Sequence, residues 1–247
     1  MSGDAAAAVP LPAVVDLVAV MDRLRSPGGC PWDAEQTHES LVGFAVEEVF
    51  EVAEAIETGD RPGLREELGD LLLQVVFHAR VAAEHPTDPF DLDDVAAGIA
   101  AKLRHRHPHV FADAQVRDAA HVHQRWEQIK AAEKSRDSVL DGVPVALPAL
   151  ARAQKVLGRV RRAGLTVDEP APDPRPVGAA GPDEEDLGRA LLDLVRRAEA
   201  RGVDAEGALR AAVRDLEARV RAVEARQDVP GGGRGPATAR RDEERSR

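Results

Sequence analysis

The chain has 247 residues, of which 43% are hydrophobic and 31% charged, a composition that excludes an intrinsically disordered protein. Its formal net charge of −11 argues against general nucleic-acid binding, because such binding depends on neutralising phosphates. The single cysteine, Cys30, excludes an intrachain disulfide and a cysteine-based zinc site.

The first part of the chain is predicted to be a bundle of helices. Residues 1–12 form a flexible N-terminus without the positively charged leader of a secretory signal, so we expect a cytoplasmic protein. Apolar residues then recur at helical spacing, and no segment alternates convincingly with period two. The predicted helices cover about residues 13–25, 41–58, 62–84, 92–106, 119–134 and 148–163. They predict an all-α domain over residues 13–163, and no apolar run reaches the roughly 20 residues of a membrane span.

The rest of the chain is predicted to contain a linker, a second helical domain and a disordered tail. The linker is rich in proline and glycine, and the tail lacks periodic apolar residues. The linker covers residues 164–183 and the tail covers residues 230–247. The second domain between them covers residues 184–229, with helices at about 184–201 and 205–226.

A weak internal repeat relates the two helical domains. Residues 185–192 repeat the pattern of residues 66–73, but Arg189 stands where the first copy has Asp70. The second copy also follows the linker directly, without a preceding acidic helix. We therefore interpret the second domain as a degenerate copy that has lost the chemistry of its acidic residues.

Four acidic residues are predicted to meet between the second and third helices. We call them the acidic quartet: Glu48, Glu51, Glu67 and Asp70. Residues three apart lie roughly 60° from each other around a helix, so each helix carries two of these acids as neighbours. The chain turns back at Gly59, and residues equidistant from a turn lie at the same height in an antiparallel hairpin. Glu51 is as far from Gly59 as Glu67 is, and the same holds for Glu48 and Asp70.

Carboxylates gathered in this way require compensation, because burying an unpaired one costs several kcal/mol. Protonation would relieve the repulsion by raised pKa values, and divalent cations would relieve it more fully. All-oxygen ligands favour Mg²⁺, Mn²⁺ or Ca²⁺ over zinc or copper. The alternative is a solvated acidic face, which is our interpretation of Glu54, Glu57 and Glu66. Glu47 is a candidate supporting group or extra ligand at the catalytic site.

The acidic pattern resembles the signature of the MazG family of nucleoside triphosphate pyrophosphohydrolases. The signature residues are Glu47-Glu48-x-x-Glu51 followed by Glu67-x-x-Asp70. Further matching segments are Gly29-Cys30-Pro31-Trp32-Asp33, Glu35-Gln36-Thr37, Glu67-Leu68-Gly69-Asp70-Leu71-Leu72, His107-Pro108-His109-Val110-Phe111 and Trp126-Glu127-x-Ile129-Lys130. The resemblance covers about residues 13–163.

This resemblance implies a helical, commonly dimeric enzyme that cleaves nucleoside triphosphates between the α and β phosphates, giving monophosphate and pyrophosphate. It implies Mg²⁺ as the cofactor, with Mn²⁺ as a possible substitute, a role in nucleotide-pool housecleaning, and the acidic quartet as both catalytic residues and metal ligands. Such chemistry needs no serine, cysteine or histidine nucleophile, since metal ions activate the attacking water and neutralise phosphate charge.

An anionic substrate also needs cationic contacts. The candidate substrate-binding residues are Lys102, Arg104, Arg106, Trp126 and Lys130, with Lys102 and Arg106 favoured by similarity. The cations near residue 106 have an alternative role, since they complement the dipole at the end of a helix. Trp126 can stack on a nucleobase or anchor a helix in the core, and the sequence leaves both open.

Two other functions are alternatives to hydrolysis. A non-catalytic nucleotide-binding or regulatory protein of the same fold is the first alternative, since the second domain has decayed. A di-iron oxidase is the second, but its Glu-x-x-His pairs are absent from the acidic quartet, and Glu35-x-x-His38 falls in a predicted loop. Zinc at His105, His107 and His109 is disfavoured, because Pro108 interrupts the tract.

A homodimer is expected from the third predicted helix, which is apolar on more than one face. Leu73 and Phe77 point away from the stripe that contains Leu64 and Leu68. A lone hairpin would expose this apolar surface, so we expect a partner subunit to cover it.

Overall fold

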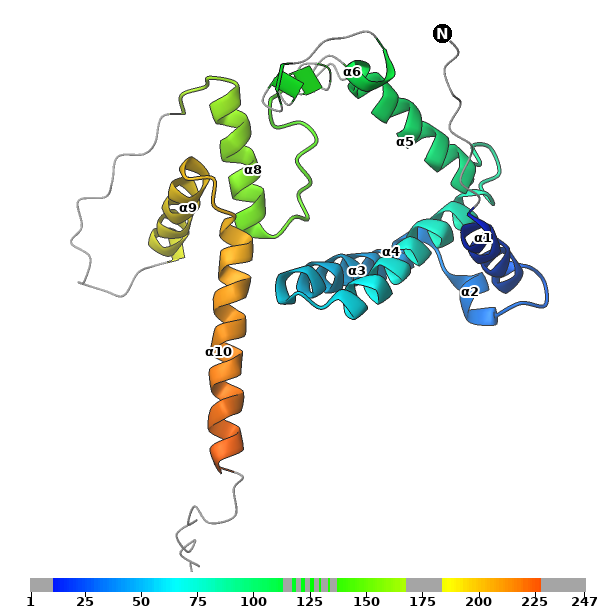
Figure 1. Ribbon diagram of the computed structural model, residues 1–247, viewed down its shortest axis with the longest axis horizontal. Coiled ribbons are helices and arrows are strands. Elements are labelled where there is room, and N and C mark those ends of the chain that lie inside the picture. Colours follow the sequence, from blue (N-terminus) through cyan, green and yellow to red (C-terminus); the bar gives the residue numbers. More distant parts are fainter. Residues whose placement is uncertain are drawn as a thin grey trace, which may run out of the picture. The chain divides into compact units, whose positions relative to one another are not determined.

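Helices make up all of the regular secondary structure that is described in the computed structural model (Figure 1). The structure describes residues 11–112, 117–118, 121–122, 125–126, 129, 133, 137–167 and 184–227. The all-α prediction is confirmed. Among the described helices, none combines the length and the hydropathy needed to cross a membrane.

The chain divides into two compact units, Met1–Ser135 and Arg136–Arg247. The helices of the first are α1 (Pro12–Arg25), α2 (Pro31–Glu35), α3 (His38–Thr58), α4 (Arg61–Ala82), α5 (Leu92–Arg106) and α6 (Pro108–Phe111). Those of the second are α8 (Ala149–Arg162), α9 (Glu184–Ala200) and α10 (Ala205–Gln227). The helix predicted at about 119–134 lies largely outside the described residues, as do residues 168–183 of the linker and the tail.

The central element of the first unit is the antiparallel hairpin of α3 and α4. A capping box begins α3, in which the Ser40 N–H donates to Thr37 Oγ1 at 3.3 Å and the Thr37 N–H donates to Ser40 Oγ at 2.9 Å. Gly59 ends the helix with φ of 73°, a left-handed conformation that glycine adopts without a Cβ clash. Asp60 then caps α4 by accepting from the Gly63 N–H at 3.1 Å. The turn at Gly59 was therefore predicted correctly.

Replacing Gly59 with Ala should lower the free energy of unfolding by about 1 kcal/mol, because an L side chain is strained at positive φ. Gly43 provides the matched control, since it lies inside α3 with open space around the position of a Cβ. Gly43→Ala should stabilise by up to about 1 kcal/mol, because alanine favours a helix. Chemical denaturation of both variants measures the difference, and equal effects would contradict this account of the turn.

The core of the first unit is formed where α1 lies against α4. Met21, Leu41, Val76 and Phe77 are buried together there, and Leu17, Leu24, Leu73, Val81 and Leu92 pack against them. At the rim, Arg25 Nε donates to Glu84 Oε1 at 2.9 Å, and Arg80 Nε donates to Asp22 Oδ1 at 2.9 Å. These contacts hold α4 in place, so the residues at its N-terminal end are presented to α3 on a fixed scaffold.

The second unit is built around α8, which packs on α9 and on the start of α10. Arg161 Nε donates to Glu199 Oε1 at 2.9 Å. Gln154 holds the turn between α9 and α10, donating to the Val203 carbonyl at 2.7 Å and accepting from the Ala205 N–H at 3.0 Å. The sequence interpretation assigned residues 148–163 to the first domain, whereas the structure groups α8 with the helices that follow it.

Candidate metal site

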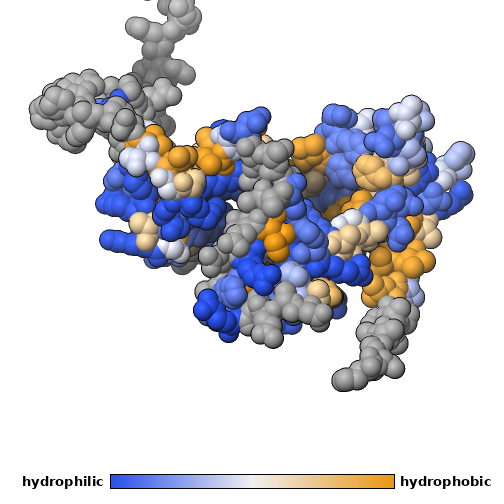
Figure 2. Space-filling model, turned by 90° about the horizontal axis from the view of Figure 1, so that it is seen from above, coloured by the Kyte–Doolittle hydropathy of each residue, from blue (hydrophilic) through white to orange (hydrophobic). Residues whose placement is uncertain are grey.

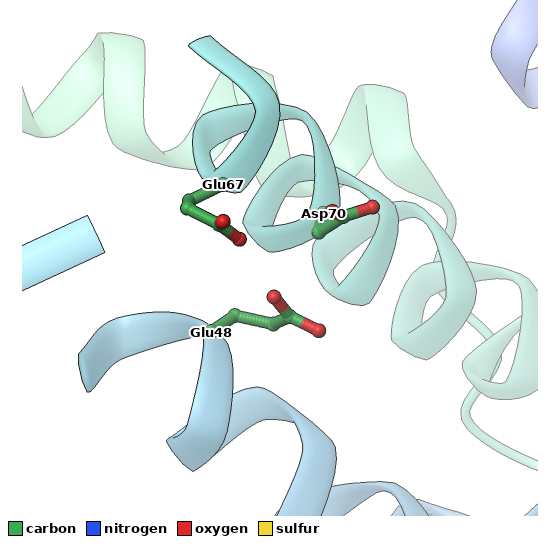
Figure 3. Close-up of side chains that lie close together, drawn as sticks. All are labelled: Glu48, Glu67 and Asp70. Carbon is green, nitrogen blue, oxygen red and sulfur yellow. The ribbon is translucent and has the colours of Figure 1, made fainter. Parts of the chain in front are cut away.

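Three carboxylates converge between the two helices of the hairpin. Glu48 extends from α3 toward Glu67 and Asp70, which project from α4 (Figure 3). One oxygen of each lies within 4.8 Å of the others, and we call these three residues the carboxylate cluster. The arrangement follows from the turn at Gly59, which brings the middle of α3 beside the first half of α4.

Glu51, the remaining member of the acidic quartet, lies at the edge of the cluster. It contacts Glu48 and Glu67 through its side chain, and repulsion from it contributes to the pKa of both. It also lines a hollow of about 210 Å³ together with Glu67, Thr58 and Asp60. Glu51 therefore connects the carboxylate cluster to a space that can admit a small group.

The cluster carries uncompensated negative charge. Burial raises the pKa of Glu48, and repulsion from Asp70 and Glu51 raises it further. Burial also raises the pKa of Glu67, with Glu51 as the next contributor. The Oε2 atom of Glu48 is buried and has no hydrogen-bond partner within the described part of the chain. In the same part of the chain, no ion pair to lysine or arginine is found for any member of the acidic quartet.

This donor set fits a hard divalent cation. Carboxylate oxygens are the ligands that Mg²⁺, Mn²⁺ and Ca²⁺ prefer, and a cation would supply the missing partner of Glu48 Oε2. It would also remove the repulsion that disfavours the ionised forms. The carboxylate cluster is therefore able to bind a metal ion. Glu47, by contrast, is exposed on α3 and does not belong to the cluster.

The predicted substrate contacts are the cationic residues at the end of α5, with Trp126 and Lys130 later in the chain. Lys102 and Arg104 are exposed near the end of α5, and Lys130 lies outside the described residues. Arg106 forms an ion pair with Glu133, donating from Nε to Oε1 at 3.0 Å. Its guanidinium also lies 5.4 Å from the centre of the half-buried Trp126 ring.

This grouping was not predicted. Glu133 stands 27 residues after Arg106, in a segment without a diagnostic spacing, so no local pattern connects the two. The Arg106 guanidinium is the largest cause that holds the pKa of Glu133 below its usual range. These contacts favour a structural role for Arg106, because its guanidinium binds Glu133 and lies over the Trp126 ring.

Among the described residues, the group of three or more candidate metal ligands is the carboxylate cluster, and it contains no histidine. The rings of His107 and His109 lie 5.6 Å apart and are tilted by 55°. His38 begins α3 and stacks on His78, whereas Glu35 ends α2. Glu35 and His38 are thus on different helices, unlike the pairs of a di-iron bundle.

Comparison with known proteins agrees with this geometry. The model of the MazG nucleotide pyrophosphohydrolase domain matches residues 36–111, the segment that contains the hairpin and α5. A nucleoside triphosphate pyrophosphohydrolase of Escherichia coli strain K12 is 42% identical over 84% of this chain and 86% of its own length. One of Mycolicibacterium smegmatis is 42% identical over 93% of the chain and 68% of its own length.

A relative with lower identity also aligns over most of this chain. The nucleoside triphosphate pyrophosphohydrolase/pyrophosphatase MazG of Thermotoga maritima is 37% identical over 85% of this chain and 84% of its own length. The shared region extends beyond the hairpin into the second unit in each case, because the aligned share of the chain exceeds the length of the first unit. The chain belongs to the MazG family of nucleotide pyrophosphohydrolases.

Proposed function

We propose that this enzyme hydrolyses nucleoside triphosphates at the bond between the α and β phosphates, releasing a nucleoside monophosphate and pyrophosphate. The observation that carries the proposal is the carboxylate cluster, in which Oε2 of Glu48 is buried and has no hydrogen-bond partner within the described residues. The names of the relatives support the same substrate class. We further propose Mg²⁺ as the cofactor, held by the acidic quartet, with Mn²⁺ as a substitute.

The acidic residues would have different roles in hydrolysis. Bound Mg²⁺ supplies charge neutralisation for the phosphates and lowers the pKa of the attacking water. The carboxylate cluster, in its ionised form, holds the metal between α3 and α4. Glu51 borders both the cluster and the hollow, so its carboxylate would complete the metal site and orient a water molecule toward the reacting phosphate. Glu47 is assigned a supporting role at the rim of the site.

The cations of α5 would contact the outer phosphates. Lys102 and Arg104 are exposed and project from the end of this helix. Arg106 is held by Glu133 and Trp126, so we assign it mainly to positioning this end of α5. Lys130 remains a candidate contact outside the described residues. Trp126 remains a candidate for stacking on the base.

Product analysis tests the reaction. The full chain is incubated with ribo- and deoxyribonucleoside triphosphates and MgCl₂, and the products are separated by ion-exchange chromatography. We expect equal amounts of monophosphate and pyrophosphate. Diphosphate with inorganic phosphate as the products would contradict cleavage at the α–β bond, and unchanged substrate would contradict the proposal as a whole.

A homodimer formed through the hairpin is also proposed. Apolar side chains reach the surface of the molecule in several patches (Figure 2). On α3 they form a stripe at helical spacing that is 50–60% exposed, consisting of Val42, Val46, Val49 and Ile56. Leu68, Leu72 and Val75 form a second exposed stripe on α4. By helical geometry both stripes lie on the side of the hairpin away from Glu51, so a second copy can cover them without blocking the hollow.

Adding Mg²⁺ or Mn²⁺ at constant ionic strength should raise the melting temperature by about 2–5 °C at pH 8, and by less at pH 5.5. The pKa values of Glu48 and Glu67 are raised in the folded protein, so without metal the stability falls as the pH rises from the ordinary carboxyl range through the raised values. Metal requires the ionised carboxylates and reverses this loss. Differential scanning fluorimetry measures both trends. The pH-dependent gain should disappear in Glu48→Gln, and its persistence there would place the metal elsewhere.

A further inference from the structure

The last helix, α10, exposes an apolar seam that has the spacing of a coiled coil. Leu209, Val213, Leu216, Val220 and Val223 follow one another at intervals of four, three, four and three residues. Their exposed fractions lie between 43% and 53%, which is high for five large apolar residues on one helix. A seam repeating every 3.5 residues on average is the pattern by which two helices pair along their length.

Nothing within the described part of the second unit covers this seam. The first turns of α10 lie against α8 and α9, where Gln154 holds the Val203 carbonyl and the Ala205 N–H. The rest of the helix projects beyond them (Figure 1), and residues 215–226 are all exposed. A helix of 23 residues that ended in solvent would leave most of this apolar surface in water.

The residue types at the seam select two strands. Val213 and Val220 occupy position a of the heptad, and Leu209 and Leu216 occupy position d. A β-branched residue at a with leucine at d is the combination that favours two-stranded, parallel pairing. Val223 completes the seam at the next position d.

The charged residues beside the seam select a second copy of the same helix in parallel register. Arg219 lies at position g and Glu224 at position e of the following heptad. In a parallel pair, g of one helix meets this e of the other, so Arg219 of each copy lies beside Glu224 of the other copy. The Glu224 carboxylate has no ion pair within the described residues.

An antiparallel pair would bury the apolar residues of the seam less completely. Matching its a and d layers would put Val223 opposite Glu206, which is the residue at position a of the first heptad. The parallel pair instead keeps all five apolar layers together. We propose that α10 pairs with α10 of a second copy of this chain as a parallel two-stranded coiled coil.

The coil extends over about 21 Å from Leu209 to Val223, given the rise of 1.5 Å per residue. This is about two heptads, which is short for an isolated pair of helices. It therefore acts together with other contacts between the copies, and the test uses the full chain. The coil is independent of the metal site, since α10 carries no member of the acidic quartet.

Disulfide cross-linking tests the pairing and its direction. In a Cys30→Ser background, Leu209→Cys places a thiol at position d near the start of the seam. A parallel pair brings two such thiols together, whereas an antiparallel pair separates them by most of the helix. Ala211→Cys is the matched control, because position f of the same heptad faces away from the seam. Mild oxidation should cross-link Leu209→Cys at least about tenfold faster than Ala211→Cys. Equal rates would overturn the proposal, whether the seam is free or covered by another segment such as α9.

Charge exchange supplies a second test in the same Leu209→Cys background. Arg219→Glu and Glu224→Arg should each slow cross-linking by about fivefold, because each turns two attractive pairs into repulsive ones. The double variant, Arg219→Glu with Glu224→Arg, restores attraction and should recover the original rate. A double variant as slow as the single ones would overturn the parallel register. Pyrophosphate release is measured on every variant and should not change, so a failure of the hydrolysis would be seen separately from a failure of the coil.

Discussion

Replacing Asp70 with Asn should reduce the rate of pyrophosphate release by at least about a thousandfold, because a charged ligand of the metal is lost while the side-chain volume is kept. Asp70 provides one of the three oxygens that lie within 4.8 Å of each other. An amide still offers one oxygen, but it contributes no negative charge to hold the cation against water. Glu51→Gln should have a similar effect on the rate, since Glu51 borders the cluster and the hollow.

Asp70→Asn should leave the fold intact and raise the melting temperature slightly when metal is absent. Repulsion from Asp70 contributes to the raised pKa of Glu48, so removing that charge relieves strain in the metal-free protein. A residue with a purely structural role would show the opposite combination, with lower stability and retained turnover. The two readouts together therefore distinguish a metal ligand from a packing residue.

Glu39→Gln is the control for the loss of a carboxylate. It removes the same kind of charge from α3, the helix that carries Glu48 and Glu51, but Glu39 lies in the first turn of that helix, away from the cluster. The rate should stay within about twofold of the unmodified enzyme when a surface charge outside the site is removed. Wild-type activity in Asp70→Asn with saturating Mg²⁺ would remove Asp70 from the site.

The hairpin could be predicted because its determinants are local. Gly59 and Pro62 set the turn, and the spacing of the acids from Gly59 then fixed which residues face each other. The structure places Glu48, Glu67 and Asp70 in one group, as that arithmetic requires. Glu51 is not part of this group, although its side chain contacts both Glu48 and Glu67.

Contacts between distant segments could not be predicted in the same way. No local spacing indicates that Arg106 forms an ion pair with Glu133 and lies over Trp126. The grouping of α8 with α9 depends on Arg161 and Glu199, which are 38 residues apart across the linker. Helical spacing shows which face of a helix is apolar, but it does not identify the segment that covers that face.

Val46→Glu should weaken the proposed homodimer by at least about a hundredfold, because it places a charge at the centre of an apolar interface. Val46 lies in the middle of the exposed stripe of α3, between Val42 and Val49. Each large apolar side chain that becomes buried contributes about 1.5–3 kcal/mol, so a stripe of this size on both copies can support a stable dimer. Analytical ultracentrifugation over a range of concentrations measures the change.

Ala19→Glu is the matched control, since it makes a similar change at an exposed position on α1 between Asp16 and Arg23. It should leave the association unchanged, because that face of α1 already carries charged residues. Neither position lies in the core, as Val46 is half exposed in the single chain, so both variants should retain their helical content. A dimer that resists Val46→Glu would show that another surface, such as α10, holds the two copies together. An unmodified chain that sediments as a monomer at micromolar concentration would show that the hairpin surface stays exposed. The stripe of α3 would then be an apolar surface exposed to water. The free-energy cost of that exposure would have to be offset by the small core of the first unit.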